Sequence, residues 1–400
     1  MDDSTAPNST PLALEGIRVL DFSQMMLGPF ATQMLADLGA DVIKVERPRT
    51  GEWERGLEFA GELLDGESAA FLAMNRNKRS IALDLKGPGA RDALLRLAAT
   101  CDVVVENFRP GVMDRLGLGY EDFKAVRADI IYCSGSGWGQ DTPAARANRP
   151  GQDLLIQAAT GLAANTGAAG DPPIAAGTSI CDATGALTLA NGVLAALLAR
   201  VRHGIGQRVE VDLFSATLAI LCQEWSAMVN QGIEVGRSRA GIAQPWLSAP
   251  FGFYRASDGW FALSMGDLGA VARVFEAPGV AELDAWHDRD AIKERLDELS
   301  PSRTVDEWLD RLLAAGLWVA PVRTMQQARE QLQAEGSPLL VRVERADGSE
   351  LELIGCPITL SETPWQQRRR PPAVGEHNEE VLREVLSESE LRELAEAGAL

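Results

Sequence analysis

The feature that most constrains this fold is an alternation of strand-like and helix-like segments early in the chain. Apolar runs typical of strands in a covered sheet occupy residues 17–22, 41–46, 79–85, 101–108 and 129–137. Segments with helical periodicity occupy residues 30–40, 87–100 and 121–128, and Pro29 and Gly39 suit the two ends of the first. This alternation predicts an α/β fold with a doubly wound, mainly parallel sheet.

Basic residues gather near the predicted strand ends, where a parallel sheet binds its ligands. Lys44, Arg47 and Arg49 end one strand, residues 75–79 (NRNKR) precede another, and Arg109 and Arg115 follow a third. Each cluster alone is what a solvated surface shows, but together they favour a local anion site. The loop after the first strand lacks G-x-G-x-x-G, so dinucleotide binding is disfavoured.

Charge and cysteine content exclude several classes of partner. The chain has 38 Lys+Arg and 57 Asp+Glu, a net charge of −19, which disfavours nucleic acid and anionic membranes as partners. Five dispersed cysteines with no C-x-x-C pair favour a reducing, cytoplasmic location and predict no metal site. Residues 183–201 are apolar enough to raise a transmembrane alternative, but their small residues favour a buried helix.

The rest of the chain predicts a second, smaller α+β unit. Hairpin patterns occur at residues 251–265 and 341–355, the latter with Asp347-Gly348 at its turn, and polar helical segments lie between them. We expect a flexible tail (1–11), the first part of a large domain (12–200), a linking helix and strand (201–224), a small domain (225–320) and a return to the large domain (321–400).

One isolated carboxylate, Asp153, follows a Pro-Gly turn and opens an apolar helical segment, PGQDLLIQAATG. Capping of that helix is the simpler interpretation, and the position alone favours it. A carboxylate in a dry site can also act as a nucleophile. The three histidines, His203, His287 and His377, are isolated, and the chain has no G-x-S-x-G, Walker or H-E-x-x-H motif.

Seven sequence blocks in a fixed order resemble the class III coenzyme A transferase family, whose members include formyl-CoA transferase, carnitine CoA-transferase and α-methylacyl-CoA racemase. The blocks are residues 14–48, 75–86, 102–120, 137–140, 151–161, 249–260 and 375–382. The resemblance implies a Rossmann-like large domain built from both chain ends, a small α+β domain between them, and a homodimer of two interlocked rings. It implies acyl-CoA and a carboxylic acid as substrates, with no permanently bound cofactor.

The resemblance also implies the site residues and reverses the preference for a cap at Asp153. It makes Asp153 the nucleophile that carries CoA as an aspartyl-CoA thioester. For the oxyanions of that reaction, the glycine-rich strand end at residues 135–139 suggests backbone N–H donors. The implied CoA contacts are Gln24, Met25, Met26, Leu27, Arg47, Leu83, Asn107, Phe108, Arg115 and Ser136.

Departures from the family pattern bear on the reaction. Gln152 stands where the racemase branch has a histidine before the aspartate, which disfavours racemase activity. Met26 makes the acyl end less polar than in formyl-CoA transferase, which disfavours formyl and oxalyl substrates. An apolar or mid-sized acyl pocket is suggested by Met25, Met26, Leu27, Trp138 and Trp246, although such residues are more often core. An acyl-CoA lyase or hydrolase, and a non-catalytic CoA-binding protein, remain alternatives.

Overall fold

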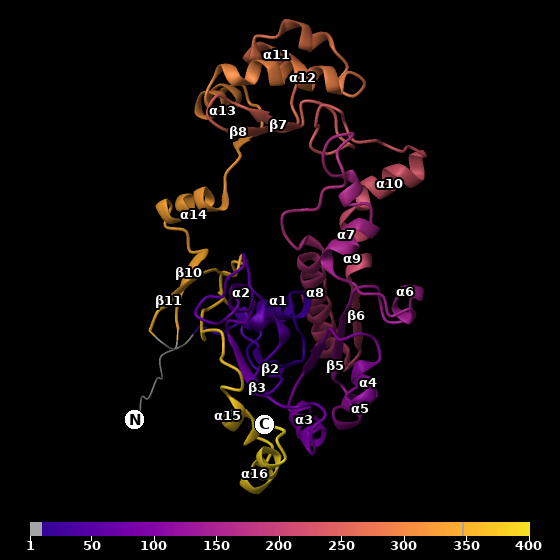
Figure 1. Cartoon of the computed structure of the whole chain (residues 1–400), viewed down its shortest axis with the longest axis vertical. Helices are drawn as coiled ribbons and strands as arrows, with labels where there is room; N and C mark the ends of the chain where they lie inside the picture. The colour runs from indigo at the N-terminus through magenta and orange to yellow at the C-terminus, as the bar shows by residue number, and fades with distance from the viewer. Residues whose placement is uncertain (1–9, 346–347) are drawn as a thin grey trace. The chain divides into compact units, whose positions relative to one another are not determined.

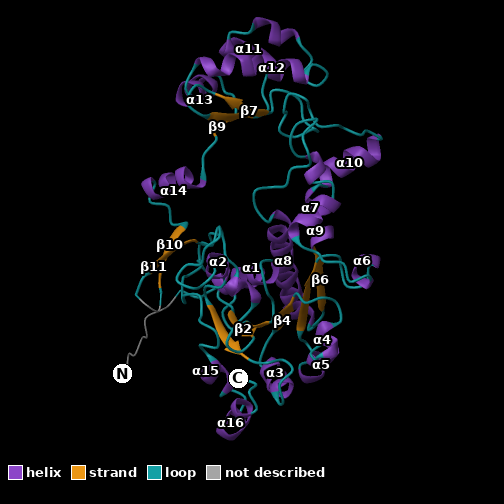
Figure 2. Ribbon diagram, viewed as in Figure 1, coloured by secondary structure: helices purple, strands orange, loops and turns teal. Residues whose placement is uncertain are grey.

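The computed structural model describes residues 10–345 and 348–400, and it divides into two compact units. Unit 1 comprises the chain up to Asp153, Ser179–Thr217 and Gly336–Leu400, and unit 2 comprises Leu154–Thr178 and Leu218–Glu335. Figure 1 shows the order of the elements along the chain, and Figure 2 shows where helices and strands lie. Most of the expected flexible tail, residues 1–11, lies outside the described residues.

Unit 1 is built on a six-stranded parallel sheet in the order β3-β2-β1-β4-β5-β6. The strands are β1 (Arg18–Asp21), β2 (Asp41–Glu46), β3 (Lys78–Ala82), β4 (Val103–Glu106), β5 (Ile131–Ser136) and β6 (Arg208–Asp212). Helix α1 (Leu27–Asp37) and helix α8 (Ile180–His203) pack against each other and on the sheet. The predicted parallel sheet is confirmed. Strands β2, β3 and β4 are buried in it almost throughout, which explains why their sequences do not alternate between apolar and polar residues.

One apolar core of unit 1 packs against the sheet. Buried side chains of β1 and β2 meet α3 (Ala90–Ala98), α5 (Tyr120–Val126), α15 (Asn378–Leu382) and α16 (Glu388–Glu396) there. The remaining helices that lie wholly in this unit are α2 (Ala69–Met74), α4 (Val112–Arg115), α6 (Pro143–Arg146) and the short 3-10 helix η1 (Trp53–Gly56). The C-terminal helices thus pack into the same core as the N-terminal segments, which agrees with the expected return of the C-terminal part of the chain to the large domain.

Helix α8 has one buried face and one exposed face. Its small residues allow close packing: a Cβ at Gly185 would lie 2.6 Å from Leu213 and 3.1 Å from Leu27. On the other face, Leu187, Leu198 and Val201 are 51%, 56% and 80% exposed. Among the described residues α8 alone has the length and composition of a membrane span. The prediction of a wholly buried helix is therefore correct for one face only.

Unit 2 contains a three-stranded antiparallel sheet of β7 (Gly252–Arg255), β8 (Trp260–Leu263) and β9 (Val319–Pro321). Its core stacks the rings of Phe275 and Trp308, whose centroids are 4.3 Å apart. The core helices are α11 (Leu268–Phe275), α12 (Arg289–Leu299) and α13 (Val305–Ala314). Two further helices of this unit are α10 (Cys222–Gln231) and α14 (Met325–Ala334), whereas α7 (Asp153–Ala159) and α9 (Leu213–Ile220) cross the boundary between the units.

The unit boundaries differ from the expected domains in three places. Residues 201–224, expected to link the domains, contain β6, which pairs with β5 in the main sheet. Residues 154–178 belong to unit 2, although they were expected in the large domain. The return to unit 1 begins at Gly336 and not at residue 321, because β9 pairs with β8 in the small sheet.

The C-terminal segment begins with a hairpin and ends by covering a sheet edge. Strands β10 (Leu340–Glu344) and β11 (Glu350–Ile354) form the predicted antiparallel hairpin, and Asp347 of its expected turn lies outside the described residues. The His377 N–H donates to the Ser80 carbonyl at 2.9 Å, and Asn378 accepts from the Ala82 N–H at 2.6 Å. This segment satisfies backbone groups on the open side of β3.

Candidate active site

Asp153 begins helix α7, and its carboxylate also lies at the start of helix α8. Asp153 is the first residue of α7 and is 7% exposed. Its Oδ1 accepts the backbone N–H groups of Cys181 and Asp182, at 2.7 and 3.1 Å, in the first turn of α8. The first N–H groups of a helix have no partner within that helix, so α8 supplies two donors to an anion held at its end.

Two glycines and a tryptophan hold the turn that presents Asp153. A Cβ on Gly137 would lie 2.4 Å from the Cα of Gly151, so only glycines permit this approach of the two backbones. The Trp138 indole donates to the Pro150 carbonyl at 2.9 Å. Ser136 accepts the Gly139 N–H at 3.0 Å. The loop after β5 therefore positions the Pro150–Asp153 turn, and one of its expected oxyanion donors is already bonded within the loop.

Side chains from two other strands fix the loop after β1. Asn107, which follows β4, accepts the Gln24 N–H at 2.8 Å and donates to the Gln24 carbonyl at 2.7 Å. Glu52 accepts the Met25 N–H at 2.8 Å and pairs with the fully buried Lys44 at 2.6 Å. Both amide atoms of Asn107 are thus engaged by the protein backbone, which makes it a positioning residue for this loop.

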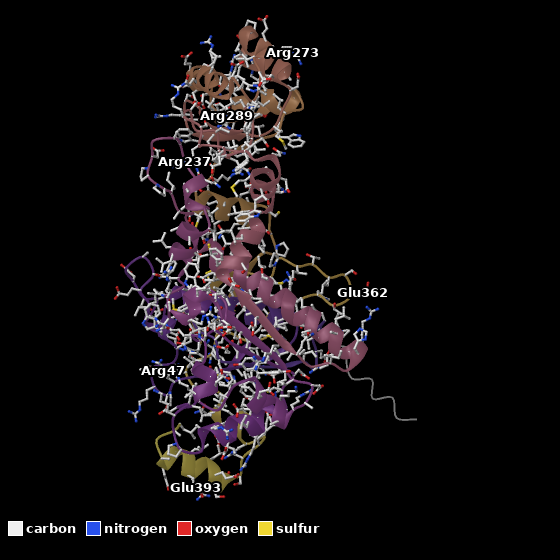
Figure 3. The ribbon with its side chains drawn as sticks, turned by 90° about the vertical axis from the view of Figure 1, so that its right-hand side faces the viewer. Arg47, Arg237, Arg273, Arg289, Glu362 and Glu393 are labelled. Carbon is white, nitrogen blue, oxygen red and sulfur yellow. The ribbon has the colours of Figure 1, made fainter. Side chains whose placement is uncertain are left out.

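A pocket of about 700 Å³ opens beside this loop, beyond the carboxyl ends of the first strands. Four of the expected CoA contacts line it: Gln24, Arg47, Leu83 and Phe108. Arg47 lies at the outer edge of the unit 1 ribbon (Figure 3). The pocket also contains Arg49, Lys86, Thr50 and Gly398. Cations and apolar side chains in one pocket suit a ligand that combines phosphate groups with a flat ring.

The other expected contacts do not line this pocket. Leu27 is 4% exposed and packs where a Cβ on Gly135 would lie 2.4 Å from its side chain. Arg115 ends α4 with an exposed side chain, and Met26 immediately precedes α1. Leu27 is therefore a core residue here, since its side chain fills the space between α1, β5 and α8.

Comparison with known proteins gives the family. The family model described as CoA-transferase family III matches residues 14–378. The chain belongs to CoA-transferase family III. The predicted family and the predicted CoA-transferase class of enzyme are both confirmed.

Named relatives are similar to this enzyme over nearly its whole length. Succinyl-CoA:glutarate CoA-transferase of Homo sapiens is 30% identical, and the alignment covers 97% of this chain and 90% of the relative. Succinate–glutarate CoA-transferase of Agrobacterium fabrum is 34% identical, with 95% and 97% covered. Formyl-CoA:oxalate CoA-transferase of Rhodopseudomonas palustris is 32% identical, with 97% of each chain covered. A CAIB/BAIF family protein from Brucella suis has a similar structure, with a TM-score of 0.81 and 29% identity over 94% of this chain and all of that one.

Two further buried carboxyl groups interact near the start of α8: Asp182 with Asp153, and Glu54 with Asp182. Burial raises the pKa of Asp182 to about 7, and the neighbouring Asp153 adds to the shift. Burial also raises the pKa of Glu54 to about 8, followed by repulsion from Glu52 and a smaller contribution from Asp182. Near neutral pH much of this negative charge is therefore removed by protons, which lowers repulsion of an anionic substrate.

Sequence reasoning missed several residues of this site. Lys86 ends the block NRNKRSIALDLK just beyond β3, so its place after a strand was the available signal. Glu54 and Asp182 carried no signal, because an acidic residue in a polar loop or a first helical turn is usually solvated. Gly398 reaches the pocket because the Ala399 carbonyl accepts the Asp84 N–H at 2.9 Å.

Proposed function

We propose that the enzyme moves CoA from an acyl-CoA donor to a carboxylic acid acceptor, with Asp153 as the nucleophile. The supporting observation is the placement of Asp153: a carboxylate 7% exposed, oriented by two backbone N–H groups, within the GQD segment of the matched family. Burial excludes most of the water that would compete with a carboxylate acceptor.

The proposed reaction needs no net proton transfer. An Asp153 oxygen attacks the donor thioester carbon, the C–S bond breaks, and CoA leaves as a thiolate from an aspartyl mixed anhydride. The thiolate attacks Cγ of Asp153 and expels the donor acid as a carboxylate, which gives the aspartyl-CoA thioester. An acceptor carboxylate then repeats both steps in reverse order. The protein holds the thiolate in place, so recapture is fast.

We assign the pocket of about 700 Å³ to the nucleotide end of CoA. Arg47, Arg49 and Lys86 would bind phosphate oxygens, and Phe108 and Leu83 would contact the adenine. The six-stranded sheet acts as a Rossmann-like CoA-binding domain, with the ligand at the carboxyl ends of its strands. CoA enters and leaves as part of the substrates, and we propose no permanently bound cofactor.

We propose succinyl-CoA as donor and glutarate as acceptor for the first assays. Two of the similar proteins are named for these acids, at 30% and 34% identity. Met26 follows the loop held by Asn107, and its apolar side chain disfavours the small polar formyl and oxalyl groups.

We propose that the working enzyme is a cytoplasmic homodimer, with interlocked subunits and neither nucleic acid nor a membrane as partner. The exposed apolar face of α8 supports association: Leu187, Leu198 and Val201 are each more than half exposed. Sedimentation velocity of the wild type should show a dimer, and Val201→Glu should shift it toward monomer, since the glutamate would place a charge in the interface. A wild type that sediments as a monomer at every concentration would contradict the dimer.

A second candidate, epimerisation at the carbon next to the thioester, is favoured by one observation. Asp182 has a pKa raised to about 7 by burial, so it can remove and return a proton near neutral pH. This reaction exchanges the α-hydrogen of an acyl-CoA in deuterated water without any acceptor acid. Transfer leaves that hydrogen in place, so mass spectrometry of the recovered acyl-CoA distinguishes the two.

Turnover of the wild type and two variants tests the proposed function. Succinyl-CoA and glutarate are incubated with the enzyme, and glutaryl-CoA is quantified by liquid chromatography. Asp153→Asn should abolish product while CoA binding persists, and Asp310→Asn, an exposed aspartate of α13, should retain wild-type rates. Full turnover by Asp153→Asn would refute the role of Asp153.

A further inference from the structure

The two donors that hold Asp153 come from a rigid part of the fold. Cys181 is fully buried, and in the next turn of α8 Gly185 packs against Leu213 and Leu27. The N–H groups of Cys181 and Asp182 reach the same oxygen, Oδ1, at 2.7 and 3.1 Å. Distances of 2.7–3.1 Å from two fixed donors are those of an oxyanion site. The two donors thus need no rearrangement to stabilise charge on Oδ1.

Glu54 is a buried acidic residue that interacts with Asp182 in the first turn of α8. Glu54 is 3% exposed, and its Oε2 has no hydrogen-bond partner in the part of the chain that the structure describes. Its carboxyl group interacts electrostatically with Asp182. A buried oxygen without a partner is costly unless something else bonds it.

We propose that the N–H groups of Cys181 and Asp182 form the oxyanion site for the enzyme's own acyl carbon, Cγ of Asp153. The proposal rests on the aspartyl-CoA pathway above. It assigns different roles to the two carboxylate oxygens: Oδ2 attacks the donor, and Oδ1 remains at the two donors throughout. The donor's own carbonyl oxygen needs a different set of partners.

The charge appears on Oδ1 in the steps that attack Cγ. When the CoA thiolate adds to the aspartyl anhydride, a C–S bond forms and the π electrons of Cγ=Oδ1 move onto Oδ1. The intermediate collapses when the bond from Cγ to the leaving carboxylate oxygen breaks, and the leaving acid takes that electron pair. The same oxygen becomes negative again when the acceptor carboxylate attacks aspartyl-CoA. The first attack, on the donor thioester, places its negative charge elsewhere.

This difference predicts a specific failure when a donor is removed. Formation of the anhydride continues, but recapture of the thiolate at Cγ slows. Free CoA then escapes and water hydrolyses the anhydride. The enzyme would lose transfer and gain net hydrolysis of the donor acyl-CoA. A substitution that simply damages the fold would slow both reactions together.

Proline substitution removes one donor and has a matched reference. Asp182→Pro deletes the N–H and the side chain, whereas Asp182→Ala deletes the side chain alone. Proline is accepted in the first turn of a helix, where the N–H has no partner within the helix. We expect transfer about 100-fold slower in Asp182→Pro than in Asp182→Ala, the usual effect of losing one oxyanion donor. Cys181→Pro and Cys181→Ala form a second pair with the same expectation.

The assay follows free thiol and glutaryl-CoA in the same reaction of succinyl-CoA with glutarate. A rise in the ratio of free CoA to glutaryl-CoA in the proline variant supports the proposal. Equal rates and equal ratios in the proline and alanine variants would overturn it. If proline disturbs folding, an amide-to-ester replacement at residue 182 deletes the same N–H without a ring. A wild type that forms no aspartyl-CoA adduct would instead refute the proposed function itself.

Discussion

Replacing Asn107 with alanine should weaken CoA binding through the loop that Asn107 holds. The amide of Asn107 makes two hydrogen bonds to Gln24, at 2.8 and 2.7 Å. Each contributes about 1 kcal/mol net, so losing both lowers the free energy of unfolding by about 2 kcal/mol. If the two hydrogen bonds exist only in the loop conformation that binds CoA, their loss lowers the population of that conformation about 30-fold. The Kd for CoA then rises by up to about 30-fold.

Three measurements separate this role from direct contact with CoA. Calorimetry gives the Kd, urea unfolding gives the stability, and hydrogen exchange reports protection of the Gln24 N–H. Asn107→Asp is a close variant that keeps one acceptor but sets an oxygen opposite the Gln24 carbonyl, so it should resemble alanine. Weaker CoA binding with unchanged stability and unchanged exchange at Gln24 would refute the positioning role and restore Asn107 as a ligand.

Three further predictions follow from buried and pocket charges. Glu52→Ala leaves the fully buried Lys44 without its partner at 2.6 Å and should cost about 3–5 kcal/mol in urea unfolding, most of it recovered in Lys44→Met/Glu52→Leu; a cost below about 1 kcal/mol would contradict this. Burial raises the pKa of Glu106 from 4.5 to about 7, so the folded state binds this proton more tightly than the unfolded state, and its contribution to stability falls by about 3 kcal/mol as pH rises from 4.5 to 7. Glu106→Gln should remove that loss, and a wild-type minus variant difference that is constant over this range would be inconsistent with it. Arg47→Gln and Lys86→Gln should each raise the calorimetric Kd for CoA about tenfold, whereas exposed Arg392→Gln should leave it unchanged; equal values in all three would remove the pocket as the phosphate site.

Local pattern was sufficient to predict the sheet but not its domain boundaries. Strands β2 and β4 are buried on both faces, so the apolar run in each sequence is enough to predict a strand in a covered sheet. The role of residues 201–224 was missed because β6 is half exposed and polar, and its pairing with β5 spans about 70 residues of sequence. Likewise β9 has only three residues, too few to show a period, so the return to unit 1 was placed too early.

The site shows a similar division. The strand-end position of the basic residues predicted Arg47, which lines the pocket, whereas the assignment of Asp153 came from the GQD segment of the family resemblance. The sequence did not reveal that Asp153 meets the start of α8, since Cys181 and Asp182 follow it by 28 and 29 residues and act through backbone groups common to every residue. The ENF block likewise predicts Asn107 as a CoA contact but does not reveal its hydrogen bonds to Gln24, because a motif names a residue and not its partner.

The intact mass of the enzyme after mixing with succinyl-CoA tests most directly whether Asp153 carries the CoA. The wild-type mass should increase by the mass of one CoA minus one water, and the added mass should map to a peptide that contains Asp153. Added glutarate should remove this adduct and release glutaryl-CoA. Asp153→Asn should gain nothing while still binding CoA. An adduct that persists in Asp153→Asn, or transfer by a wild type that never shows an adduct, would contradict the covalent pathway.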